Sequence, residues 1–132
     1  MGGRGANSTG GNGGAPRGYR TVGKVRGIPV IKCSDPQGNT LPRRANPHSQ
    51  YFGMNKKGSI KQLRLYDKKG EVKKDIDWQH SFDGNRNGTV HSHKWENGER
   101  QKEHSPLTKS EIEKYRKAIE KATGRKDLIW KW

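Results

Sequence analysis

The stretch IKQLRLYDKKGEVKKDIDW, from Ile60 to Trp78, decides the fold of this chain. Its first arm, residues 60–66, precedes the turn sequence 67–70, whose final glycine can adopt the positive φ that other residues resist. Apolar and charged residues alternate along the second arm, with the period of two that separates the two faces of a strand. The pattern predicts a β-hairpin in which Asp75 and Asp77 project from the same face.

Strand and turn signals continue on both sides of this hairpin. Residues 19–32 predict a first hairpin around the turn 26–27, and Pro29 predicts an edge position because proline cannot donate a hydrogen bond to a neighbouring strand. Three prolines between residues 34 and 49 predict a long loop. A further strand is expected over residues 89–95.

One helix is predicted near the C-terminus, from about Thr108 to Ala122. Thr108 and Glu111 have the spacing of a capping box, apolar residues then recur every three or four positions, and Gly124 supplies a C-terminal cap. The apolar tail after residue 126 could add a last strand. The predicted fold class is therefore α+β: a small antiparallel sheet of short hairpins packed against one C-terminal helix.

Glycine content divides the chain in two. Residues 1–18 contain eight glycines and predict a disordered glycine-rich tether, while residues 19–132 predict a single small α+β domain. The chain has no hydrophobic signal region and no apolar run of the roughly 20 residues that span a bilayer. We therefore expect a cytoplasmic protein, or one delivered into a target cell as part of a larger protein, with no membrane partner. The only cysteine, Cys33, excludes an internal disulfide and a cysteine-based zinc site.

Charge indicates the kind of partner. The chain has 28 basic and 13 acidic residues, a formal net charge of +15, and residues 1–66 hold 12 of the basic and one of the acidic residues. Clustered Lys and Arg displace the counterions held by phosphates, so nucleic acid is the first expected partner and an acidic protein the second. The candidate nucleic-acid contacts are Arg43, Arg44, Lys56, Lys57 and Arg86.

Most of the chemically capable side chains fall between residues 75 and 93, and the candidate catalytic residues are Asp75, Asp77, His80, His91 and His93. In the first interpretation, one imidazole takes the proton from a ribose 2′-hydroxyl and another protonates the leaving 5′-oxygen, with no metal or other cofactor. In the second, His80, His91 and His93 are metal ligands, since His-x-His on a strand is a common ligand arrangement. In the third, the histidines pair with the aspartates only to stabilise a domain with a small core. His48 and His104 are expected at the surface, outside this group.

The run GSIKQLRLYDKKGEVKKDIDWQH, followed by VHSHKW, resembles a C-terminal domain of prophage minor head or head-morphogenesis proteins and of bacterial polymorphic toxins. The resemblance covers about Asn46 to Trp95. In such toxins the C-terminal domain is commonly a nuclease, often an RNase, neutralised by an immunity protein. It implies a toxin-like RNase that acts on RNA and is bound by an acidic immunity or inhibitor protein. The alternative is a non-enzymatic phage-related protein that binds nucleic acid or an acidic partner through its basic surface.

Overall fold

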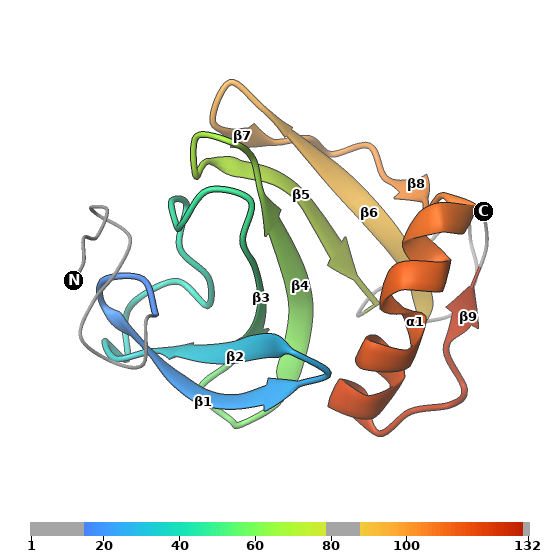
Figure 1. The fold of residues 1–132 in the computed structure, drawn as a ribbon, viewed down its shortest axis with the longest axis horizontal. Helices are drawn as coiled ribbons and strands as arrows, with labels where there is room; N and C mark the ends of the chain where they lie inside the picture. Colours follow the sequence, from blue (N-terminus) through green and yellow to red (C-terminus); the bar gives the residue numbers. More distant parts are fainter. Residues whose placement is uncertain (1–14, 79–87, 131–132) are drawn as a thin grey trace.

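The computed structural model of the chain describes residues 15–78 and 88–130, and Figure 1 shows their arrangement. Residues 1–14, which make up most of the predicted tether, lie outside the described residues. Ala15 is buried, and the amide of Tyr19 donates a hydrogen bond to the carbonyl of Pro16 over 3.0 Å. Among the described residues, contacts with the domain therefore begin at Ala15, four residues before Tyr19, where the sequence predicts the domain to start.

The described residues form a mostly antiparallel open sheet and one C-terminal helix, α1. The order along the main path is β1-β2-β3-β4-β5-β6-β7, and β8 and β9 both pair with β6. The elements are β1 (Tyr19–Val25), β2 (Ile28–Cys33), β3 (Gln50–Met54), β4 (Ile60–Tyr66), β5 (Val72–Asp77), β6 (Thr89–Glu96), β7 (Glu99–Arg100), β8 (Ser105–Pro106), α1 (Lys109–Thr123) and β9 (Ile129–Trp130).

The predicted hairpins β1–β2 and β4–β5 are confirmed, and so are the strand β6 and the short final strand β9. Two features of the sheet differ from the prediction. It has nine strands in the described residues, and β2 pairs with β3, and β6 with β9, in parallel. Local turn signals cannot reveal these parallel pairs, because each joins strands that are separated by a long connection.

Positive φ angles fix the tight turns. Arg26 and Gly27 have φ of 49° and 84°, and Asn97 and Gly98 have 54° and 77°. Two successive residues with positive φ are typical of the type I′ turn, whose twist matches that of the flanking strands. The two hairpins β1–β2 and β6–β7 therefore each close with a two-residue loop.

The edge position predicted from Pro29 is wrong. β2 lies between β1 and β3, and its pairing with β3 begins only at Val30. Pro29 pairs with Lys24 of β1 but lies one residue before the parallel ladder, so its missing N–H removes no hydrogen bond from the pairing with β3. The proline limits the length of that ladder but does not determine the position of the strand.

The two faces of the sheet carry two apolar clusters. One cluster packs against α1 and includes Phe52, Leu63 and Ile76 from the sheet and Ile112 and Ile119 from the helix. The other lies where the loop of residues 34–49 covers the opposite face, and it contains Ala15, Tyr19, Ile31, Leu41, Ala45, Tyr51, Tyr66 and Val72. In Figure 1 the helix and this loop lie on opposite sides of β3, β4 and β5. The predicted packing of helix on sheet is thereby confirmed.

A register shift between Leu65 and Tyr66 breaks the simple alternation of β5. Leu65 pairs with Lys74, whereas Tyr66 pairs with Val72, so one additional residue is accommodated in β5. As a result Val72 packs with Tyr66 under the loop, while Ile76 packs on the helix side. The bulge moves Val72 to the face that carries Asp75 and Asp77, where the alternation alone would not place it.

The helix begins and ends as its sequence predicts. The Thr108 side chain accepts a hydrogen bond from the Glu111 amide, the Glu111 carboxylate accepts one from the Thr108 amide, and Gly124 adopts a φ of 70° at the C-cap. Lys74 on β5 also bonds the Glu111 carboxylate over 2.6 Å, and this contact contributes to lowering the pKa of that carboxyl against the effect of its burial. The capping residue therefore also links the helix to the sheet.

Gly70 of the central hairpin accepts a hydrogen bond from the amide of Ala45 in the covering loop. We therefore expect alanine substitutions at Gly70 and at Gly58 to lower the stability of the protein by different amounts. Gly70 and Gly58 have φ of 81° and 85°, but only at Gly70 would a Cβ collide with the carbonyl oxygen of Ala45. We expect Gly58→Ala to lower the free energy of unfolding by about 1–2 kcal/mol, the cost of a left-handed residue. Gly70→Ala should lower it by several kcal/mol more, as measured by urea denaturation. Equal losses would mean that the loop moves aside without cost.

Candidate histidine–aspartate site

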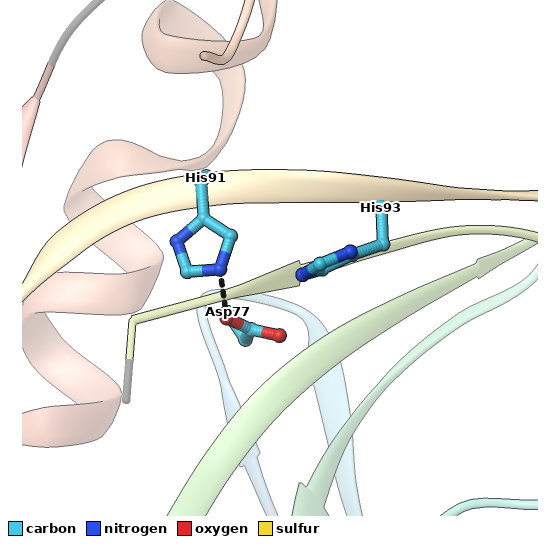
Figure 2. A group of neighbouring side chains, drawn as sticks. All are labelled: Asp77, His91 and His93. Carbon is cyan, nitrogen blue, oxygen red and sulfur yellow. Dashed lines mark ion pairs between the residues drawn. The ribbon is translucent and has the colours of Figure 1, made fainter. Parts of the chain in front are cut away.

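The central strands place four of the candidate residues opposite one another. In the antiparallel pair β5–β6, Asp75 lies opposite His93 and Asp77 lies opposite His91. Directly opposite residues have their Cβ atoms about 5 Å apart, so each aspartate can reach a histidine ring. Both aspartates lie on the same face of β5, as the alternation predicts, and Figure 2 shows Asp77 beneath the rings of His91 and His93.

Asp75 belongs to a buried ion pair with Arg64 of β4. The Arg64 Nε and one terminal nitrogen donate to the two Asp75 oxygens over 2.6 and 3.0 Å, while the indole N–H of Trp95 donates to Oδ2 over 2.9 Å. Arg64 also reaches the carbonyls of Leu41 and Pro42 in the covering loop. The Asp75 carboxylate is therefore fully engaged in holding β4, β5, β6 and the loop together.

Asp77 pairs with the fully buried ring of His91. The His91 Nε2 lies 2.7 Å from the Asp77 Oδ1, and its Nδ1 lies 2.8 Å from the carbonyl oxygen of Thr89. A carbonyl only accepts hydrogen bonds, so Nδ1 carries a proton, and the short contact at Nε2 requires a second proton between the ring and the carboxylate. Arg100 of β7 donates to the other Asp77 oxygen over 2.6 Å. Protonated His91 and Arg100 thus share the Asp77 carboxylate.

His93 and His104 complete a group of three imidazoles. The His93 Nδ1 lies 3.0 Å from the carbonyl oxygen of Gln101, which leaves Nε2 as its basic nitrogen. Ring centroids are 5.1 Å apart for His91 and His93, 5.1 Å for His91 and His104, and 5.5 Å for His93 and His104. The surface position expected for His104 is therefore wrong, because the segment 101–106 folds back along β6 and brings this half-buried ring over the other two.

Their surroundings move the pKa values of the two strand histidines in opposite directions. Burial alone would lower the pKa of His91, but the hydrogen bond to Asp77, the bond to the Thr89 carbonyl and the Asp77 charge raise it above its usual value. Burial and then the Arg100 charge lower the pKa of His93. The pKa of one ring is thus raised and that of its neighbour lowered, an arrangement typical of acid–base pairs in active sites.

Three of these side chains also fit a divalent metal. One ligand atom from each of Asp77, His91 and His93 lies within 4.8 Å of the others, and each histidine Nδ1 bonds a backbone carbonyl, as in many zinc sites. Bonds of about 2.1 Å in a tetrahedral site hold two ligand atoms roughly 3.4 Å apart. The 2.7 Å separation of His91 Nε2 from Asp77 Oδ1 is shorter, and it corresponds to a direct ion pair. A cation would have to separate this pair.

The remaining predicted residues lie in different places. His80 and Arg86 fall outside the described residues. Arg43 lies with its guanidinium 5.6 Å from the centroid of the Trp95 ring, and Arg44 forms an exposed ion pair with Glu71. Lys56 and Lys57 follow β3 and line a hollow near Lys61, away from the histidines. Sequence reasoning missed Arg64, Arg100 and His104. For Arg64 a signal was present, since a basic residue inside an apolar strand opposite Asp75 in the hairpin suggests a buried pair.

The comparisons with known proteins add no relative. No family model matches the chain, and neither the curated proteins nor the solved structures contain a match. Among the residues that the structure describes, no helix has the length and apolar character needed to cross a membrane.

The opposite pKa shifts predict a stability maximum near pH 6.5. His91 has a raised pKa, so its contribution is complete below about pH 6.5 and is lost as pH rises through the raised value. His93 has a lowered pKa, so its contribution is present above about pH 6.5 and is lost as pH falls. The test is the melting temperature, Tm, measured between pH 4.5 and 8.5. His91→Asn should reduce the fall of Tm above about pH 6.5, and His93→Asn should reduce the fall of Tm below it. Unchanged slopes would contradict the assigned protonation states.

The buried ion pair predicts a large loss of stability for Asp75→Asn. The Arg64 side chain is 10% exposed and Asp75 is fully buried, so the substitution leaves a buried guanidinium without its carboxylate. Breaking such a pair costs about 3–5 kcal/mol. Glu71→Gln is the matched control, because it makes the same chemical change in an exposed pair and should cost less than about 1 kcal/mol. Equal losses of unfolding free energy in urea denaturation would show that the buried ion pair contributes no more to stability than the exposed one.

Proposed function

We propose that this chain is a nucleic-acid-directed, toxin-like RNase in which His91 and His93 carry out acid–base catalysis. The observation that carries the proposal is the pair of adjacent histidines whose pKa values move apart, each for an identified physical reason. A protonated and a neutral imidazole side by side are the two groups that cleavage of RNA at its own 2′-hydroxyl needs.

His93 is the proposed base and His91 the proposed acid. The His93 Nδ1–H is committed to the Gln101 carbonyl, so Nε2 takes the proton of the 2′-hydroxyl. The 2′-oxygen then attacks phosphorus, the bond from phosphorus to the 5′-oxygen breaks, and the leaving oxygen receives a proton from His91, whose buried Nε2 must first exchange its Asp77 partner for the substrate. The products are a 2′,3′-cyclic phosphate and a 5′-hydroxyl. The Thr89 carbonyl holds Nδ1, so Nε2 is the nitrogen from which this proton is transferred.

Arg100 and His104 mark the side from which a phosphate approaches. The Arg100 side chain is 38% exposed while it contacts Asp77 and lies 3.5 Å from Asp75, and His104 is half-buried over the two other rings. A guanidinium at this edge supplies the fixed positive charge that stabilises the pentacoordinate phosphorus. Asp75 is a positioning residue in this scheme, because its oxygens hold Arg64 and Trp95.

The toxin-like part of the proposal rests on the resemblance over Asn46 to Trp95. It includes an acidic immunity or inhibitor protein that would cover the basic surface of the chain. The competing function is binding of nucleic acid or an acidic protein without turnover, and the net charge of +15 supports binding in either case. Only a cleavage assay separates the two functions.

The test is incubation of the purified chain with total RNA and with plasmid DNA, with and without EDTA. We expect RNA to be degraded in both conditions to fragments with cyclic phosphate ends, and DNA to survive because it has no 2′-hydroxyl. Loss of cleavage in EDTA, restored by zinc, would replace acid–base catalysis with a metal site at Asp77, His91 and His93. Nucleic acid that shifts on a gel without being cut would support the binding protein.

The variant His93→Asn tests the base directly. Asparagine keeps a donor near the position of Nδ1 for the Gln101 carbonyl but removes Nε2, so the fold should survive while cleavage falls by about 10²–10⁴-fold. His48→Asn is the control, because His48 is exposed, lies outside the site and has a φ of 58°, which asparagine tolerates. The assignment of His93 fails if both variants cleave at the wild-type rate.

A further inference from the structure

A basic hollow lies on the side of the loop away from the histidines. It has a volume of about 430 Å³ and lies between β2, the β3–β4 turn and the start of the loop. Four lysines line it with one acidic residue, Asp35. The lysines are Lys32, Lys56, Lys57 and Lys61. This excess of positive charge in a concave site favours a ligand with several negative charges.

A second hollow continues the first toward β6. It has a volume of about 230 Å³ and is lined by polar and basic residues from the loop and the sheet, with Trp95 at its far end. Thr40 lines both hollows, so they adjoin at this residue. We call the combined feature the lysine groove; its further lining residues include Asn39, Leu41, Arg43, Gln62 and Arg64.

The size of the groove selects a single strand over a duplex. The first hollow is of the order of a small-molecule pocket, roughly 300–1,000 Å³, the second is smaller, and neither can receive a double helix. Trp95 is half-buried, with the buried Arg64 4.9 Å and the exposed Arg43 5.6 Å from its ring centroid, so a base that stacks on the indole takes the place of Arg43. An indole beside a guanidinium can stack on an unpaired base, a contact that tolerates any sequence.

The groove comes near the candidate site at Trp95, which lies two residues along β6 from His93. Trp95 and His93 are alternate residues on the same face of β6, so they are about 7 Å apart along the strand, roughly one nucleotide step. Asp75 bonds both the Trp95 indole and Arg64, which links the end of the groove to the strand that carries Asp77. A chain that lies on Trp95 therefore has its next phosphate within reach of Arg100, which pairs with Trp95 across β6–β7 and whose side chain is 38% exposed.

We propose that single-stranded RNA binds along the lysine groove, with its phosphates beside the four lysines and a base on Trp95, and enters the histidine site from there. The inference rests on the proposed RNase function for its choice of RNA, while the groove itself rests on charge and shape. The proposal adds Lys32, Lys61, Gln62 and Trp95 to the nucleic-acid contacts expected from sequence, and it specifies the surface along which the RNA strand lies.

The test uses an uncleavable ligand so that binding is separated from turnover. A fluorescein-labelled 2′-O-methyl RNA of twelve nucleotides lacks the nucleophile, and its binding to the full chain is followed by anisotropy across salt concentrations. We expect Lys56→Gln/Lys57→Gln to weaken binding about 10- to 30-fold at 0.1 M salt and to lower the salt slope by about 1.4, or about 0.7 for each lost phosphate contact. The double variant Lys109→Gln/Lys117→Gln removes the same charge from exposed positions on α1, and it should change affinity less than about twofold.

The outcomes separate the groove from the catalytic proposal. If wild type binds this RNA but cleaves no RNA, the groove stands and the RNase falls. If wild type cleaves RNA and the Lys56/Lys57 variant binds and cleaves as wild type does, the groove falls and the RNase stands. Equal weakening by both double variants would reduce the interaction to diffuse attraction. Competition by duplex RNA or by polyglutamate at the same charge concentration would also overturn the proposal.

Discussion

The ion pair between Arg64 and Asp75 is the interaction on which the rest of the structure depends. It lies in the interior, where separating two charges from water costs several kcal/mol for each ion. The bidentate geometry offsets this cost, and the remaining Arg64 donors reach the Leu41 and Pro42 carbonyls while Asp75 also accepts from Trp95. A single buried contact therefore joins β4, β5, β6 and the covering loop, and this explains how a loop of residues 34–49 without strands of its own keeps a fixed place.

The same face explains why His91 can remain charged. Arg64 and Arg100 are balanced by Asp75 and Asp77, so the proton on His91 leaves one excess positive charge in the cluster. An imidazolium surrounded only by apolar groups would release its proton. Here Asp77 retains that proton, and the excess charge disfavours a second proton on His93. The opposite pKa shifts of the two rings thus have different causes: contacts with Asp77 and the Thr89 carbonyl raise the pKa of His91, whereas burial and then the Arg100 charge lower that of His93.

Local patterns predicted most of the fold. The turn glycines, the capping box at Thr108 and the strand alternation depend on neighbours within a few residues, and these elements lie where the sequence indicates. The parallel pairs, the interior position of β2 and the place of His104 depend on contacts between distant segments. For the site, alternation and His-x-His spacing brought Asp77, His91 and His93 together correctly. Sequence alone could not show that Asp75 is bound to Arg64, because a carboxylate in a structural pair and one in an active site have the same spacing.

The covering loop, residues 34–49, contributes both to the buried ion-pair network and to the lining of the lysine groove. Its residues Leu41 and Pro42 accept hydrogen bonds from Arg64 on one side, and its residues Asn39, Thr40 and Arg43 line the lysine groove on the other. A phosphate chain in the groove would contact the loop segment whose carbonyls accept hydrogen bonds from Arg64. Asp75 of the same ion pair accepts a hydrogen bond from Trp95, which lines the groove. Since Arg64 contacts both the loop and Asp75, the loop cannot leave the sheet without exposing that charge. The contacts that stabilise the domain therefore also fix the residues that line the groove, so the proposed RNA strand would bind to a surface that is already formed.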